Sequence, residues 1–268
     1  MIQTLTLKEE EMSFLSGILG GKEEPIPTMD KRIVEKTLKD RLWPILKVHG
    51  FQTFRGTTAW RHAEKKIDVV HIEFFNKGLH DKWGTTPYSF ALATGCFSPF
   101  IPPITQPSIQ QDKNGLLLPK ETACHLRKTP SRKLRQGDCK IPNVWYVDPE
   151  GEYLAPAVTD AKEVLEGEVL SWFKRFDDSY ELLRTLLEDP EDMSTSNNCW
   201  GFGRKNSPVR FFLIGFAALE LQKWQMARDT LQQALITGRF AALTGTQAIE
   251  DEIRRGIAKA ETALRGVV

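Results

Sequence analysis

Residues Gly50–Gly95 decide the fold of this chain, and they read GFQTFRGTTAWRHAEKKIDVVHIEFFNKGLHDKWGTTPYSFALATG. Three runs within them are rich in β-branched and aromatic residues and are bounded by turn-forming residues, as strands are. These runs are Thr58–His62, Ile67–Phe75 and Tyr88–Gly95. Their short connections, Ala63–Lys66 and the loop Asn76–Pro87, together with a period-2 alternation of side chains, predict an antiparallel meander.

The second run also predicts which side of the sheet is buried. Successive side chains of a strand point to opposite sides. The two sides of this run hold Val70, Ile72 and Phe74, and Val69, His71 and Glu73. We therefore expect one side to face the core and the other to be partly polar.

A helix is predicted immediately before the meander. Asp30 is a suitable N-cap, and Gly50 supplies the left-handed residue that commonly ends a helix. The apolar residues between them recur at helical spacing: Ile33, Val34, Leu38, Leu42, Ile45 and Leu46. Pro44 is expected to kink this helix, because a proline removes one hydrogen bond and clashes with the preceding turn.

Residues 1–28 are interpreted as a helical arm followed by a linker. Thr6 and Glu9 have the spacing of a capping box, and Gly20-Gly21 would end the helix. The apolar residues between them are Met12, Leu15, Ile18 and Leu19. We expect this arm to pack on its own domain; the alternative is exchange with a neighbouring subunit.

Residues 96–143 form a long irregular excursion, because Pro99, Pro102, Pro103 and Pro107 interrupt regular structure. Excursions of this length in folded proteins are either functional or disordered. Two short strands are predicted in and after it, Thr122–Arg127 and Val144–Val147.

The chain is predicted to be helical after Asp148. Asp160 and Asp178 are expected to cap two helices. After a polar loop, three more are predicted: Pro208–Gln222, Gln225–Thr237 and Thr246–Leu264. The predicted fold class is α+β, an antiparallel sheet flanked by an N-terminal helix and followed by a helical C-terminal region. The expected divisions are 1–28, 29–190 and 191–268.

Charge and composition limit the class of protein. No apolar run approaches the ~18–20 residues needed to span a bilayer, and Glu9, Glu10 and Glu11 stand where a secretory signal carries positive charge. A cytoplasmic, non-membrane protein is expected. Residues 148–192 hold 14 acidic and 4 basic side chains, whereas residues 120–140 hold 7 basic and 2 acidic ones. This asymmetry favours a protein partner, or docking of the two segments on each other.

The four cysteines are Cys96, Cys124, Cys139 and Cys199. They are widely spaced and form no CxxC pair, so free buried thiols are expected. Cys124-His125 could supply zinc ligands with other Cys or His residues, but structural zinc sites need close-spaced pairs. We therefore predict neither a metal nor a cofactor.

Two resemblances follow from short motifs. The first is carried by the helix end Leu46–Phe51, the strand at Trp60-Arg61, the hydrophobic strand before Asn76, the segment Cys124–Arg127, and Val144–Val147 leading to Trp172-Phe173. Over residues 29–187 these resemble the bacterial domain of unknown function 4304, which implies a fold and a bacterial source but no activity.

The second resemblance covers residues 207–240, which are similar to one tetratricopeptide unit. The matching packing positions are Ile214, Gly215, Trp224, Ala227, Leu231 and Ala234, and the departures are Ala218 and Arg239. A single unit cannot form a repeat array, so a helical hairpin that packs on its neighbours is implied.

The candidate binding residues are Arg61, His71, His125 and Arg127. If His125 and Arg127 lie on a strand next to Arg61 and on its side, they would form a site for anions or carboxylates. The alternative is that they are ordinary solvent-side residues of the sheet. Trp60 is a further candidate, because its ring could stack on a base.

No catalytic residue is assigned, since serine-hydrolase, P-loop and dinucleotide-binding motifs are all missing from the sequence. The leading hypothesis is a non-enzymatic protein-binding module, of which neutralisation of a partner by an immunity-like protein is one form. The first alternative is a hydrolase-like enzyme that uses His71 or His125 with a carboxylate such as Glu73. The second is nucleic-acid binding through the basic residues 120–140.

Overall fold

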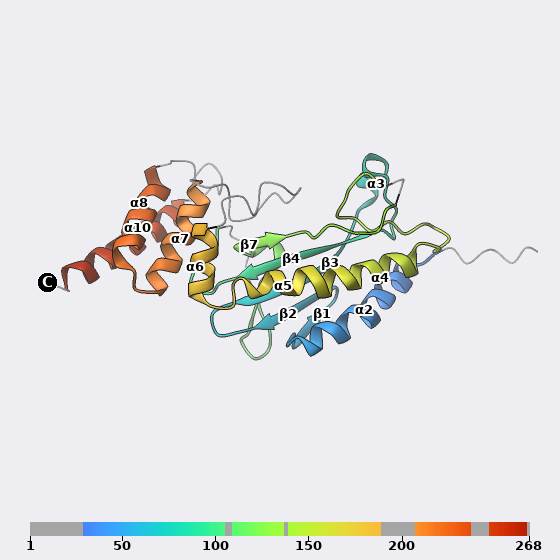
Figure 1. Cartoon of the computed structure of the whole chain (residues 1–268), viewed down its shortest axis with the longest axis horizontal. Helices are drawn as coiled ribbons and strands as arrows, with labels where there is room; N and C mark the ends of the chain where they lie inside the picture. The colour runs from blue at the N-terminus through green and yellow to red at the C-terminus, as the bar shows by residue number, and fades with distance from the viewer. Residues whose placement is uncertain (1–28, 105–108, 137–138, 189–206, 237–246, 267–268) are drawn as a thin grey trace, which may run out of the picture.

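A five-stranded antiparallel sheet lies at the centre of the computed structural model, which describes residues 29–104, 109–136, 139–188, 207–236 and 247–266 (Figure 1). Its order is β1-β2-β3-β4-β7, and every neighbouring pair is antiparallel. The strands are β1 Thr53–Arg55, β2 Thr58–His62, β3 Ile67–Phe74, β4 Phe90–Phe97 and β7 Leu126–Lys128. The predicted α+β fold and its meander are confirmed, with β4 placed two residues later than its predicted run.

Helices cover one face of the sheet. Helix α2 (Lys31–Val48) lies beside a longer rod formed by α4 (Leu154–Val164), a π-helical turn η2 (Leu165–Val169) and α5 (Leu170–Lys174) (Figure 1). Buried side chains of the sheet and of these helices form one hydrophobic cluster, which includes Leu38, Leu42, Ala59, Val70, Ile72, Leu92 and Phe173. We call this the helix-covered face. It is the side of β3 that the alternation predicts to be buried.

The opposite face carries a smaller cluster. A two-stranded hairpin of β5 (Gln110–Gln111) and β6 (Leu117–Leu118) and the 3₁₀ turn η1 (Glu121–Ala123) contribute to it. Its buried members are Trp60, Ile67, Val69, Phe97, Leu118 and Cys124. We call this the hairpin-covered face. Because η1 approaches β4 closely, a Cβ atom at Gly95 would lie 2.6 Å from the Cys124 side chain.

Helix α2 begins and ends as its sequence predicts. The Asp30 carboxylate accepts a hydrogen bond of 2.8 Å from the Arg32 backbone N–H, and Gly50 adopts a φ of 84° after the helix. Pro44 lies inside the helix, which continues to Val48. The stripe Val34, Leu38, Leu42 and Leu46 is fully buried.

Three predicted elements differ from the structure. The predicted loop 76–87 contains a short helix, α3 (Lys77–Trp83). The predicted strand 122–127 divides into η1 and β7, because the N–H of Cys124 turns back to the carbonyl of Glu121 at 3.0 Å. The predicted strand 144–147 is reduced to a single bridge between Trp145 and Phe90.

The predicted cap at Asp160 is also wrong, because α4 begins at Leu154 and Asp160 lies within it. The amides that precede this helix are satisfied from upstream. The Asp148 carboxylate accepts hydrogen bonds from the N–H groups of Tyr153 (2.7 Å) and Glu152 (3.1 Å). Asp160 instead accepts hydrogen bonds from Trp145 Nε1 (2.7 Å) and from the Lys133 N–H (3.0 Å), which ties α4 to the excursion.

The C-terminal helices are α6 (Ser179–Glu188), α7 (Pro208–Glu220), α8 (Trp224–Ile236) and α10 (Gln247–Arg265). Asp178 accepts a hydrogen bond of 2.8 Å from the Glu181 N–H, so the predicted cap of α6 is confirmed. Helices α7 and α8 form the expected hairpin, and α10 packs on both (Figure 1). Their buried side chains belong to the same hydrophobic cluster as the helix-covered face.

Several predictions lie outside the described residues. These are the arm at 1–28, Pro107, Cys199, the polar loop 190–206 before α7, and Arg239 of the tetratricopeptide-like segment. Within the described residues, no helix combines the length and the low polarity needed to cross a membrane.

Candidate functional site

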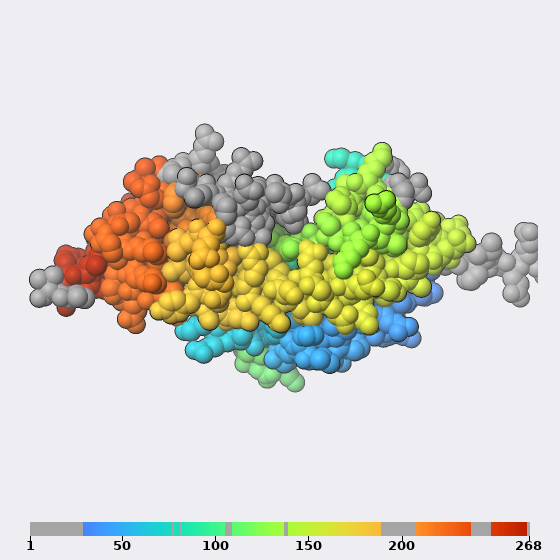
Figure 2. Space-filling view, viewed as in Figure 1, coloured from blue at the N-terminus to red at the C-terminus, as the bar shows by residue number. Residues whose placement is uncertain are grey.

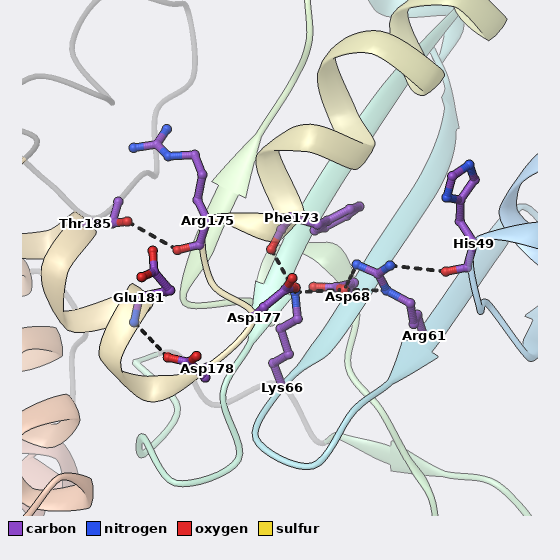
Figure 3. Close-up of polar contacts among 10 residues, drawn as sticks. All are labelled: His49, Arg61, Lys66, Asp68, Phe173, Arg175, Asp177, Asp178, Glu181 and Thr185. Atoms are coloured by element: carbon purple, nitrogen blue, oxygen red, sulfur yellow. Dashed lines mark hydrogen bonds and ion pairs between the residues drawn. The ribbon is translucent and has the colours of Figure 1, made fainter.

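Four charged side chains meet where the β2–β3 turn contacts the end of α5 (Figure 3). We call Arg61, Lys66, Asp68 and Asp177 the charge cluster. Asp68 lies on β3 on the helix-covered face and has no solvent exposure. Its Oδ2 accepts a hydrogen bond of 2.7 Å from Arg61 Nε and lies 3.2 Å from Lys66 Nζ.

Lys66 joins the sheet to the helices that follow it. Its ammonium donates to the carbonyl of Phe173 at 2.8 Å and lies 2.8 Å from Asp177 Oδ1. With Asp68, the ammonium therefore has one hydrogen bond and two ion pairs. Lys66 is 3% exposed, so its charge is held inside the protein by these three contacts.

Arg61 connects the sheet to the end of α2. Its Nη1 donates to the His49 carbonyl at 3.1 Å (Figure 3). Its guanidinium lies over the rings of Phe51 and Phe173. Burial raises the pKa of the Asp68 carboxyl, against the opposing attraction of Lys66 and Arg61. The arrangement pairs two cations with two carboxylates and holds the sheet, the end of α2 and the end of α5 together, which is a structural task.

The structure separates Arg61 from the other predicted site residues. Arg61 pairs in register with Asp68, on the helix-covered face. Trp60 and His71 are on the opposite face, and so is Arg127, which pairs with Gly95. His125 joins them there, since its ring stacks on Phe97 at 4.7 Å. The hairpin-covered face therefore brings four of the five candidates to one side of the sheet.

His125 is buried with both ring nitrogens engaged. Nε2 donates to the carbonyl of Pro102 at 3.1 Å, and Nδ1 accepts from the Ser98 N–H at 3.1 Å. These two contacts require the neutral ring with its proton on Nε2. Burial lowers the pKa of His125 to about 4. The ring anchors the excursion to β4 and has no nitrogen left for a substrate.

His71 is half-buried, and its Nδ1 lies 2.8 Å from the Thr58 hydroxyl. Burial lowers its pKa, and the nearby Glu121 carboxylate opposes that shift. Burial also raises the pKa of Glu73, two residues along the strand on the same side. Among the described residues, no hydrogen bond joins His71 to either carboxylate, so the oriented His–carboxylate pair of a general base is not formed.

Arg127 and Trp60 both have internal partners. Arg127 Nε donates to Glu121 Oε1 at 2.5 Å, and Glu121 is buried. Trp60 Nε1 donates to the Pro119 carbonyl at 2.8 Å, and its ring is buried in the smaller cluster. Trp60 therefore has no free face on which a base could stack.

The three described cysteines are buried and free. Burial raises the pKa of Cys96 and of Cys124 well above the usual thiol value. Both are therefore protonated near neutral pH and are poor nucleophiles. Among the described residues, no group of three His, Cys, Asp or Glu side chains is placed to hold a metal ion.

Much of the basic charge at 120–140 is also used internally. Lys128 Nζ lies 2.7 Å from Glu168, so one ion pair joins the basic segment to the acidic one. The Arg132 guanidinium donates to the backbone carbonyls of Val144, Leu134 and Cys139, at 2.7 to 2.8 Å. These contacts organise the loop and leave fewer cations for phosphate groups.

The acidic segment 148–188 runs along the surface. Figure 2 shows it as a yellow to gold band from α4 to α6. Glu152, Glu163 and Glu166 are exposed, and none of the three forms an ion pair with another described residue. We call these three residues the acidic row. Glu163 and Glu166 are three residues apart on the rod, where like charges repel each other by a few tenths of a kcal/mol.

A groove borders the acidic row. It has a volume of about 470 Å³ and is lined by Leu134 of the excursion and by one side of α4: Ala155, Pro156, Thr159, Asp160 and Glu163. Most of this lining is carbon, and the Asp160 Oδ2 within it already accepts two hydrogen bonds.

Sequence reasoning missed Lys66, Asp68, Glu121 and Asp177. A signal for Asp68 was present, because a carboxylate shares the strand side of Val70 and Ile72 and so requires a buried cation. Two of the three partners of Lys66, Phe173 and Asp177, lie about 110 residues away along the chain, and no local pattern indicates them.

Comparisons of this chain with models of protein families, with curated proteins and with solved structures found no match. The resemblances to the domain of unknown function 4304 and to a tetratricopeptide unit stay predictions. The case for a function consequently rests on the contacts described above.

Proposed function

We propose that this chain is a protein-binding module that contacts a basic partner through the acidic row, Glu152, Glu163 and Glu166. The observation that carries the proposal is a set of three exposed carboxylates, one just before the rod and two on it, none of which forms an ion pair with another described residue. A basic partner would remove the repulsion between Glu163 and Glu166 and gain attraction of its own. Neutralisation of a harmful partner, as immunity proteins do, is one form of such binding.

The state of the candidate catalytic residues supports binding over hydrolysis. His125 has two hydrogen-bonded nitrogens, and the thiols of Cys96 and Cys124 have raised pKa values. His71 pairs with the Thr58 hydroxyl and with no carboxylate among the described residues. Binding through the acidic row requires none of these groups.

The test compares two double variants with equal changes of charge. Glu163→Lys with Glu166→Lys reverses the acidic row, whereas Glu64→Lys with Asp251→Lys reverses two exposed acids elsewhere. Each full-length protein is immobilised and exposed to extract of its source cells at low salt. The retained proteins are identified by mass spectrometry and then purified for titration.

We expect a basic protein to be retained by the wild type and by the control variant, and to be released as salt rises. Its affinity for the acidic-row variant should be weaker by about tenfold or more, which corresponds to about 1.4 kcal/mol. Equal affinity of the partner for both double variants would reject the acidic row as the contact surface.

A further inference from the structure

Helix α2 presents a row of cations to solvent. Arg32, Lys36, Arg41 and Lys47 are exposed, and none of them forms an ion pair with another described residue. We call these four residues the basic row. Arg32 and Lys36 are four residues apart on the helix, where like charges repel each other. The basic row therefore favours contact with an anionic surface.

The basic row and the acidic row lie side by side on one face of the molecule. At one end, the Met29 N–H before α2 donates to the Pro149 carbonyl before α4 at 3.0 Å. At the other end, the ring centroids of Phe51, after α2, and Phe173 of α5 are 6.1 Å apart. Helix α2 and the rod are therefore parallel, and Figure 2 shows α2, in blue, below the yellow to gold band.

The two rows match in length and are opposite in charge. The basic row spans about 22 Å along α2, and the acidic row spans about 21 Å along the rod. One exposed side chain of the opposite sign lies among each row, Asp40 on α2 and Lys162 on the rod. Each lowers the charge of its row by one, and both signs are unchanged.

Exposed apolar side chains lie on the same two elements. Ile33 and Val48 of α2 are 52% and 84% exposed, and Tyr153, immediately before α4, is 46% exposed. Removal of such side chains from water favours association. They would add an apolar contribution to a contact made through the two rows.

A second copy of the chain is complementary to this surface. A two-fold axis parallel to the two helices and between them places α2 of each copy on the rod of the other. Both helices keep their direction under this rotation. The first part of the basic row then lies opposite Glu152, and its last part lies opposite Glu163 and Glu166.

We propose that two copies of this chain associate through the two rows, with α2 of each copy on the acidic row of the other. This inference rests on the proposed function, because it names a second copy as the basic partner of the acidic row. Two helices, each about 10 Å wide and about 22 Å long, give about 440 Å² per copy. Interfaces of this size are weak and transient, so the dimer should form at high protein concentration and low salt.

The experiment measures the average mass of the full chain by sedimentation velocity, over a series of protein concentrations. We expect this mass to rise towards that of two chains at low salt and to return to that of one chain at high salt. Lys36→Glu with Lys47→Glu reverses the basic row, and Glu163→Lys with Glu166→Lys reverses the acidic row. Each double variant should raise the dissociation constant of the dimer by about tenfold or more.

A mixture of the two double variants tests the pairing itself. In each variant alone, like charges would face each other across the two-fold axis. In the mixed pair, the reversed α2 of one protein faces the reversed rod of the other, and the two native rows also face each other. The mixture should therefore associate with about the wild-type affinity. Lys113→Glu with Lys140→Glu, an equal change of charge at exposed positions elsewhere, should also keep that affinity.

Three outcomes would overturn the proposal. The first is a chain that stays a single copy at low salt at every concentration. The second is a dimer that persists in either double variant, since another surface would then form it. The third is a mixture that does not associate although circular dichroism shows both variants to be folded. The proposed function would survive these outcomes if the acidic row still retained a basic protein from cell extract, so the two failures can be told apart.

Discussion

At the scale of single residues, charge is buried at positions that hold distant elements together. Lys66 and Asp68 are each nearly or fully buried, and each has more than one partner of opposite charge or polarity. Taking such groups out of water costs several kcal/mol per ion, so the cluster is stable only while all its members are present. Removal of one member should therefore lower the free energy of unfolding by more than the energy of its own contacts, because it leaves a buried charge without a partner.

The first prediction concerns Asp68. Asp68→Ala leaves Arg61 and Lys66 beside each other without their shared carboxylate, and should lower the free energy of unfolding by about 3–5 kcal/mol. The measurement is urea unfolding followed by circular dichroism. Glu35→Ala, which removes the partly exposed ion pair of Glu35 with Lys39, should change the free energy of unfolding by less than about 1 kcal/mol. Similar losses in both variants would contradict this reading.

The second prediction concerns pH. An unfolded histidine titrates near 6.5, whereas the folded pKa of His125 is about 4. As the pH falls, the unfolded chain therefore binds the proton first. The stability from neutral His125 is complete above about pH 6.5 and is lost between about 6.5 and 4, by about 3 kcal/mol in total.

His125→Gln isolates this effect from that of His71, whose pKa is also lowered. We expect the urea midpoint of this variant to depend less on pH between 4 and 6.5 than that of the wild type. His49→Gln replaces an exposed histidine and should keep the wild-type slope. An unchanged slope in His125→Gln would mean that the ring is not held neutral.

At the scale of elements, patterns local to the chain were predictable and pairings across the chain were not. The side-chain alternation at 67–74 gave the buried side of β3, because a strand repeats every two residues whatever its neighbours are. Asp178 was identified as a cap because its partner, Glu181, is three residues away. The predicted cap at Asp160 is wrong because Asp148 accepts the hydrogen bond from the Tyr153 N–H just before α4. Asp160 lies inside the helix and accepts a hydrogen bond from the Trp145 side chain.

The candidate site shows the same limit. The alternation of side chains within β3 predicts that His71 and Glu73 lie on the same side of that strand. Which residues of other strands share that side depends on the strand order and the pairing register. Because β7 pairs with β4 and not with β2, two strands separate Arg127 from Arg61, and the two side chains lie on opposite faces of the sheet. The approach of η1 to Gly95, which buries Cys124, likewise has no local pattern.

The third prediction tests the α7–α8 hairpin. A Cβ atom at Gly215 would lie 2.5 Å or less from the Leu231 side chain, so Gly215→Ala forces the two helices apart. It should cost about 1–3 kcal/mol of unfolding free energy, as overpacked cores do. Gly167→Ala is the matched control, because open space surrounds that position in η2 and alanine favours helix by up to about 1 kcal/mol. The two substitutions should shift the thermal midpoint in opposite directions.

At the scale of the whole molecule, the helical region and the sheet share one core. The main cluster includes Leu38 of α2, Ile72 of β3 and Leu231 of α8. Arg210 of α7 donates to the carbonyl of Leu186 at 2.8 Å, and Lys65 of the β2–β3 turn lies 2.7 Å from Glu220. The division at 190–191 predicted from the sequence is thus crossed by apolar, hydrogen-bonded and ionic contacts.

The fourth prediction is that this chain unfolds in one transition. Tryptophan fluorescence and far-ultraviolet circular dichroism should give coincident thermal curves, and the calorimetric enthalpy should equal the van't Hoff enthalpy. Two resolved transitions, with α7–α10 melting apart from the sheet, would show that the shared core does not couple the two regions.

The burial of Lys66 has a consequence for its chemistry. An amine reacts with acylating reagents only through its free, unprotonated form, and the Lys66 ammonium is buried between the Phe173 carbonyl and the carboxylates of Asp68 and Asp177. Acylation at Lys66 can proceed only after the β2–β3 turn has separated from α5. The rate of acylation at Lys66, compared with that at the exposed Lys36, would therefore measure how often this junction opens.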